Sequence, residues 1–220
     1  MHRRTDRLGH RLRGEPEPVR PPRPEHGYRW IHRSPLSTAA TVTVVTGTTT
    51  GDVLRAFGAD PDRPVRLRDL RLQPGADPWV AVLDTGAAVL AVEYNGYLGS
   101  RAEVLLAASA QGRAASMFWN VNAVTRLSFA ERGRLLASFE PMGDVDTDPV
   151  VAATLAGLDF AGYGGRAEKG LVAVERFTGR GVTAVDLARI EEEGIAFRAA
   201  RPIGRRRGPD ESHAPSSRTR

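Results

Sequence analysis

The sequence predicts an α+β domain with an antiparallel sheet of about six strands, a hairpin plus a meander, flanked by four or five helices. Short β-branched and apolar runs recur between turn-forming residues, which is typical of strands joined by tight turns. Helix-capping patterns introduce amphipathic stretches before and after these runs. The 220 residues, 41% of them hydrophobic, are enough for one domain with a substantial core.

The two ends of the chain differ in composition from the part between them. Residues 1–35 are rich in Arg, Pro and Gly with little apolar periodicity, which predicts a disordered basic leader. Residues 201–220 are predicted to be a disordered basic tail, which leaves a single α+β domain at residues 36–200. The net charge of +5 therefore belongs to the ends of the chain. Either end could touch nucleic acid, but the lack of interleaved aromatic residues favours a plain solvated extension.

The first predicted elements alternate between strands and a helix. A β-branched run predicts a strand at 41–46, and a capping box followed by an apolar stripe predicts a helix at 50–57. Residues 59–77, with many prolines, aspartates and arginines, are predicted to be a loop. Strands at 79–83 and 87–93 are predicted to form a hairpin.

The middle of the chain carries the clearest turn and strand signals. A capping box at Ser100-Arg101-Ala102-Glu103 predicts a helix that ends near Ala110. Strands are predicted at 114–122, 124–130 and 134–140, and a meander is their simplest topology. Alternation puts large apolar groups on both faces of the first strand, so we expect an interior strand whose Asn120 and Asn122 need buried hydrogen-bond partners.

The last predicted elements are mostly helical. Asp148-Pro149 is expected to cap a helix that continues to Leu158, and helices are predicted at 166–177 and 183–193. Residues 195–199 are expected to add an edge strand.

Residue types limit the chemistry. The chain has no cysteine, its five histidines lie outside residues 33–212, and its only lysine is Lys169. Ser-His-Asp catalysis, Cys-His catalysis and histidine-zinc sites are therefore not expected within the predicted domain. We accordingly favour a protein that is not an enzyme.

Two motif-like stretches do not change this expectation, so we predict neither a metal nor a cofactor. The aspartates of 144–148 lack the glycine and glutamate of a helix-loop-helix calcium site. Residues 162–167 fit the dinucleotide pattern G-x-G-x-x-A, but a helix is expected before them and too little chain follows to complete an alternating sheet. Neither a long apolar run nor a signal sequence is visible, which predicts a cytoplasmic protein with no membrane partner.

Three sequence blocks carry a resemblance to known proteins. Glu93-Tyr94-Asn95-Gly96-Tyr97-Leu98-Gly99, the block from Phe118 to Val124 and Phe139-Glu140-Pro141 resemble the signature blocks of an uncharacterised domain-of-unknown-function family from high-GC soil bacteria. The likeness covers about Trp30 to Ala199. This resemblance implies where the folded domain begins and ends, but it implies no established activity.

Two hypotheses for function follow. The first is a non-catalytic recognition module for an unknown protein or a small polar ligand. The alternative is a carboxylate-based hydrolase or transferase using Glu93 and Glu140, because paired carboxylates are the acid-base groups that the sequence leaves. Six polar residues are predicted to form the binding rim: Glu93, Asn95, Tyr97, Asn120, Asn122 and Glu140.

Overall fold

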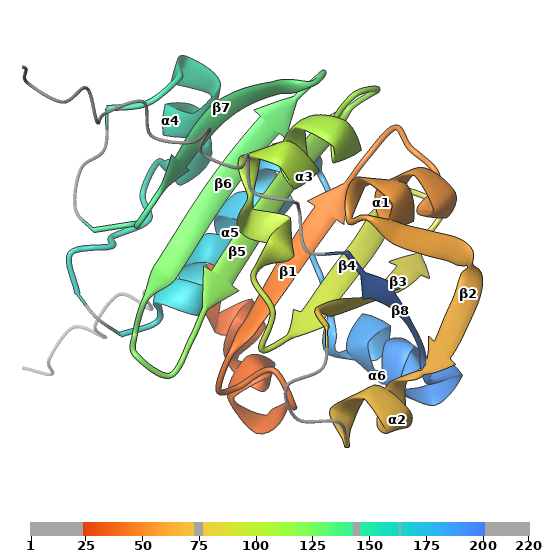
Figure 1. Cartoon of the computed structure of the whole chain (residues 1–220). Coiled ribbons are helices and arrows are strands. Elements are labelled where there is room, and N and C mark those ends of the chain that lie inside the picture. Colours follow the sequence, from red (N-terminus) through yellow and green to blue (C-terminus); the bar gives the residue numbers. More distant parts are fainter. Residues whose placement is uncertain (1–23, 73–76, 143–145, 163, 201–220) are drawn as a thin grey trace, which may run out of the picture.

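The computed structural model describes residues 24–72, 77–142, 146–162 and 164–200. One antiparallel sheet runs through this part of the chain in the order β2-β8-β3-β4-β1-β5-β6-β7, with helices on both faces (Figure 1). The predicted class is confirmed, but the sheet has eight strands rather than about six. Its strands are β1 (Ala40–Val45), β2 (Ala59–Arg66), β3 (Trp79–Asp84), β4 (Val89–Tyr94), β5 (Arg113–Trp119), β6 (Thr125–Glu131), β7 (Arg134–Phe139) and β8 (Ile195–Ala199).

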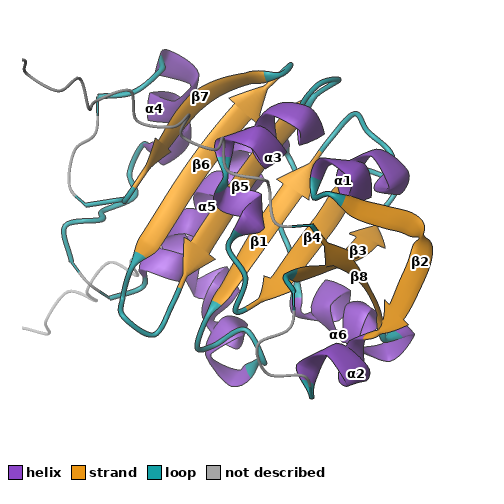
Figure 2. Ribbon diagram, in the orientation of Figure 1, coloured by secondary structure: helices purple, strands orange, loops and turns teal. Residues whose placement is uncertain are grey.

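Helices cover both faces of this sheet (Figure 2). One apolar core lies beneath η1, α5 and α6, and a second lies beneath α1, η2 and α3. Among the described residues, no helix is both long and apolar enough to cross a membrane. The helices are η1 (Pro24–Arg33), α1 (Thr50–Ala56), α2 (Leu67–Arg71), η2 (Leu98–Ser100), α3 (Ala102–Ala108), α4 (Pro149–Leu155), α5 (Arg166–Thr178) and α6 (Ala184–Glu193).

The predicted hairpin and meander are confirmed as β3–β4 and β5–β6–β7. The predicted loop at 59–77 is wrong, because its first part forms β2 and α2. β2 lies at the edge of the sheet, where Pro61 and Pro64 are tolerated because one side of an edge strand has no ladder to complete. The predicted edge strand at 195–199 is instead internal, since β8 pairs with both β2 and β3.

The capping signals in the sequence predict the starts of α4 and α6 correctly, but the capping box predicted for α3 is wrong. The Asp148 side chain accepts the Val150 N–H at the start of α4, and Thr183 and Asp186 form a capping box at α6. The capping box predicted at Ser100 is not formed, because Arg101 is the N-cap of α3 and caps it with no side-chain hydrogen bond. Ser100 belongs to η2 instead.

The described fold begins before the predicted boundary at residue 36. η1 packs on α5 and buries Tyr28 and Ile31, because its apolar side chains share one side of a short helical turn. His32 in this helix lies 2.6 Å from the Glu168 carboxylate, so a histidine does belong to the folded part. Residues 1–23 and 201–220, which hold the rest of the predicted leader and the tail, lie outside the described residues.

Candidate functional site

Three loops that are distant in sequence lie at the same end of the sheet. β4 and β5 both end beside the start of β1, where Ala40 is opposite Tyr94 and Trp119. β7 ends at the same level, because Phe139 is opposite Leu127 near the start of β6. Segments 95–97, 120–124 and 140–142 therefore share one end of the sheet, and with them the exposed residues of the predicted rim.

Glu93 is not part of the exposed rim. Its side chain is fully buried, and its two carboxyl oxygens accept the N–H groups of Leu98 and Gly99 at 2.8 and 2.7 Å. Burial raises the pKa of the Glu93 carboxyl to about 7, although the backbone N–H groups of Gly99, Leu98 and Tyr97 lower it. Glu93 therefore anchors the segment that follows β4 through these two hydrogen bonds.

The predicted carboxylate pair is not brought together. Glu93 lies on β4 and Glu140 follows β7, so β1, β5 and β6 separate them. Four steps across a sheet at about 4.8 Å each put their Cα atoms roughly 19 Å apart. Two catalytic carboxylates are typically about 5 to 10 Å apart. A mechanism that uses Glu93 and Glu140 as a pair is therefore wrong.

The two asparagines lie in a turn rather than in the sheet core. β5 ends at Trp119, and Asn120 Oδ1 accepts the N–H groups of Asn122 and Val124 at 3.0 and 3.1 Å. Ala123 adopts a left-handed conformation in this tight connection. The expected burial of both amides is wrong, because the chain leaves the sheet one residue before Asn120, and Asn122 is exposed.

The same end of the sheet exposes four large apolar side chains, which we call the sheet-end surface. They are Tyr97 (43% exposed), Val121 (71%), Val124 (44%) and Met142 (55%). The Tyr97 ring meets the Phe118 ring edge-on, with centroids 4.9 Å apart, so its position is fixed by packing. The sequence analysis places Val121 and Val124 in strands, whereas the structure places both in the turn between β5 and β6. Asn120 and Asn122, which are typical turn residues, are the sequence signal that indicates this turn.

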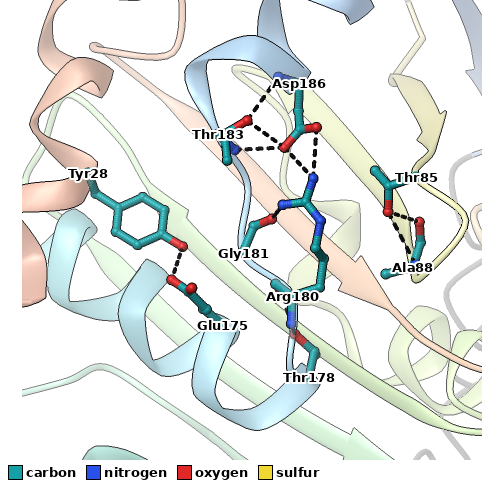
Figure 3. Close-up of polar contacts among 9 residues, drawn as sticks. All are labelled: Tyr28, Thr85, Ala88, Glu175, Thr178, Arg180, Gly181, Thr183 and Asp186. Atoms are coloured by element: carbon teal, nitrogen blue, oxygen red, sulfur yellow. Dashed lines mark hydrogen bonds and ion pairs between the residues drawn. The ribbon is translucent and has the colours of Figure 1, made fainter.

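Other polar groups in the described part of the chain are largely satisfied internally (Figure 3). The Tyr28 hydroxyl donates to Glu175 at 2.7 Å, and Arg180 donates to both oxygens of Asp186 at 2.8 and 2.7 Å. Between α2 and α6 lies a hollow of about 530 Å³ that contains charges of both signs. There, Arg71 is already paired with Glu191. The hydrogen bonds and ion pairs named here stabilise the fold.

Comparison with protein-family models matches residues 24–156 to a family described as a family of unknown function (DUF6461). The match begins before Trp30, where the likeness was expected to begin, and ends well before Ala199. All three loops of the sheet-end surface lie within the matched residues. Neither the curated proteins nor the solved structures give a match.

Proposed function

We propose that this chain, which belongs to the family of unknown function DUF6461, is a non-catalytic recognition module. Its binding site is the sheet-end surface, and its ligand is a partner protein that covers apolar side chains. The observation that supports this most directly is the grouping of exposed apolar side chains. Half of the eight large hydrophobic residues that are exposed in the described part of the chain lie at this one end.

The composition of the surface agrees with protein recognition. A ring that is partly buried and partly exposed loses little freedom on binding, which is why tyrosine is enriched at binding hot spots. Tyr97 has this property because Phe118 supports one side of its ring. The exposed polar residues Asn95, Asn122 and Glu140 belong to the same three loops, and polar atoms are typical of the rim of a protein interface.

Introducing a charge at Val121 should weaken partner binding strongly without unfolding the protein. Val121→Asp places a carboxylate in the loop that lies between the other two along the sheet, and we expect at least a tenfold loss of affinity because a buried, unpaired charge is strongly unfavourable. The measurement is affinity capture from the native cell, followed by titration of the captured partner after purification. Val185→Asp is the matched control, because Val185 is 69% exposed on α6, away from the three loops. Equal loss in both variants, or in neither, would contradict the proposed surface.

Removing the Tyr97 ring should separate binding from stability. We expect Tyr97→Ala to weaken the same partner at least tenfold and to lower the free energy of unfolding by only about 1 kcal/mol, the scale of one aromatic pair. Urea denaturation measures the second quantity. A loss of several kcal/mol with unchanged affinity would show that Tyr97 serves the architecture alone.

A further inference from the structure

The hollow between α2 and the end of α6, which we call the α2–α6 hollow, has fixed walls. The two helices lie side by side in Figure 1. The Leu67 N–H donates to the Gly194 carbonyl at 2.8 Å, and Arg71 forms an ion pair with Glu191 across the hollow. Its volume of about 530 Å³ is within the range of small-molecule binding sites. A ligand would therefore meet walls that are already in place.

Arginine side chains dominate the charge of the α2–α6 hollow. Its charged lining residues are Arg66, Arg68, Arg71, Glu191 and Glu193. Within the described part of the chain, the Arg66 side chain has no ion pair and no hydrogen bond. Arg68 lies 3.6 Å from its neighbour Asp69, and such an exposed, long ion pair is weak. Two guanidinium groups therefore keep hydrogen-bond donors for an anion.

The two glutamates of the hollow are each next to a cation. Glu191 Oε1 accepts hydrogen bonds from Arg71 and from the Tyr94 hydroxyl. Arg71 also lies over the Tyr94 ring, 4.3 Å from its centroid, which fixes its position. Glu193 lies 3.7 Å from Arg189, one turn earlier on α6. Much of the negative charge of the hollow is therefore compensated within the protein.

Apolar side chains complete the lining. Leu67 is buried, whereas Leu72 is 79% exposed. Ile195, which is 46% exposed, is opposite Arg66 in the β2–β8 ladder. Leu72 and Ile195 are two of the eight large hydrophobic residues that are exposed in the described part of the chain, and neither belongs to the sheet-end surface. A ligand with an apolar part would remove some of this surface from water.

We infer that the α2–α6 hollow binds a small organic anion, whose carboxylate is held by Arg66 and Arg68 and whose apolar part lies against Leu67 and Leu72. A planar carboxylate matches the paired N–H groups of a guanidinium. The site shares no side chain with the sheet-end surface, so it does not rest on the proposed function. No sequence pattern indicates it, because its two walls come from segments that are distant in the chain.

Titration of the full chain with sodium benzoate at constant ionic strength tests the site. Benzoate joins a carboxylate to an apolar ring, whereas benzamide has the ring without the charge and acetate has the charge without the ring. In NMR spectra, the backbone amides of Leu67, Leu72 and Gly194 should shift with benzoate and saturate with a Kd of about 1 mM. Benzamide and acetate should each bind about tenfold more weakly.

Two arginine variants and one matched control locate the binding. Arg66→Ala and Arg68→Ala should each weaken benzoate binding about tenfold, because each removes a charged hydrogen-bond donor. Both residues are exposed, so we expect both variants to fold. Arg63→Ala should retain the full affinity, because Arg63 is an exposed arginine of β2 that does not line the hollow.

Three results would overturn the site. Shifts that do not saturate, or equal affinity for benzoate and acetate, would show only a weak response to surface charge. Unchanged affinity in both Arg66→Ala and Arg68→Ala, or an equal loss in Arg63→Ala, would place the response outside the hollow. None of these results affects the binding test at Val121, so the two proposals fail separately.

Discussion

Replacing Asp186 with alanine should destabilise the protein by about 4 kcal/mol, which is the range for breaking a buried ion pair together with a helix cap. The Asp186 carboxylate is buried and accepts the Thr183 N–H, the Thr183 hydroxyl and two bonds from Arg180. The alanine variant leaves Arg180 and the first turn of α6 without these partners. Urea denaturation at pH 7 measures the loss.

The reason for so large an effect is visible in the pKa of Asp186. Burial alone would raise it, but hydrogen bonds from Arg180 and Thr183 outweigh burial and hold the pKa of Asp186 below its usual value near 3.8. The stabilisation is therefore fully present above that value and is lost as the pH falls through the lower, folded-state pKa. Glu192→Ala on the same helix is a suitable control, since Glu192 is exposed. If both variants lost the same stability, the cluster around Asp186 would have no special role.

Adding one methyl group at Gly99 should cost about 3 kcal/mol, because the space beneath η2 is already filled. A Cβ on Gly99 would collide with Thr43 Oγ1 and lie 3.0 Å from Glu93 Oε2. η2 would have to rise from β1, and the bonds that Glu93 accepts would lengthen. Urea denaturation of Gly99→Ala measures this cost.

A double-mutant cycle distinguishes the collision from a backbone effect. Thr43→Ala removes the hydroxyl with which the new methyl collides, and that hydroxyl has no hydrogen-bond partner in the described structure. Gly99→Ala should therefore cost about 2 kcal/mol less in the Thr43→Ala background than in the unmodified protein. Additive effects of the two substitutions would show that crowding against Thr43 is not the cause.

Much of the fold could be predicted because its signals are local. The β5–β6–β7 meander joins strands that are neighbours in sequence, so each strand pairs with the next one along the chain. The pairing of β2 with β8 could not be found in the same way, because more than a hundred residues separate them. β2 also contains prolines and charged residues, and as an edge strand it does not need the apolar alternation that identifies internal strands.

The residues proposed from the sequence lie in loops at one end of the sheet, but the sequence did not show which of their side chains are exposed. The predicted rim included residues from 93–97 together with Asn120 and Asn122. The structure places these segments at one end of the sheet. Polar residue types suggested a polar rim, yet the oxygens of Glu93 and Asn120 accept backbone N–H groups from the residues that follow them in the chain. Whether a polar side chain is free to contact a partner depends on these hydrogen bonds. The residue type alone does not reveal whether they form.

The place of β8 in the sheet has a consequence for how the protein is made. β8 is among the last described residues, and β2 and β3 are each hydrogen-bonded to it. The ribosome therefore has to release residues up to Ala199 before the sheet can close, although residues 24–156 are the part matched by the family model. Until then β3 has an open edge that can pair with other nascent chains. Cellular yield should depend on how quickly translation supplies the last helix and strand.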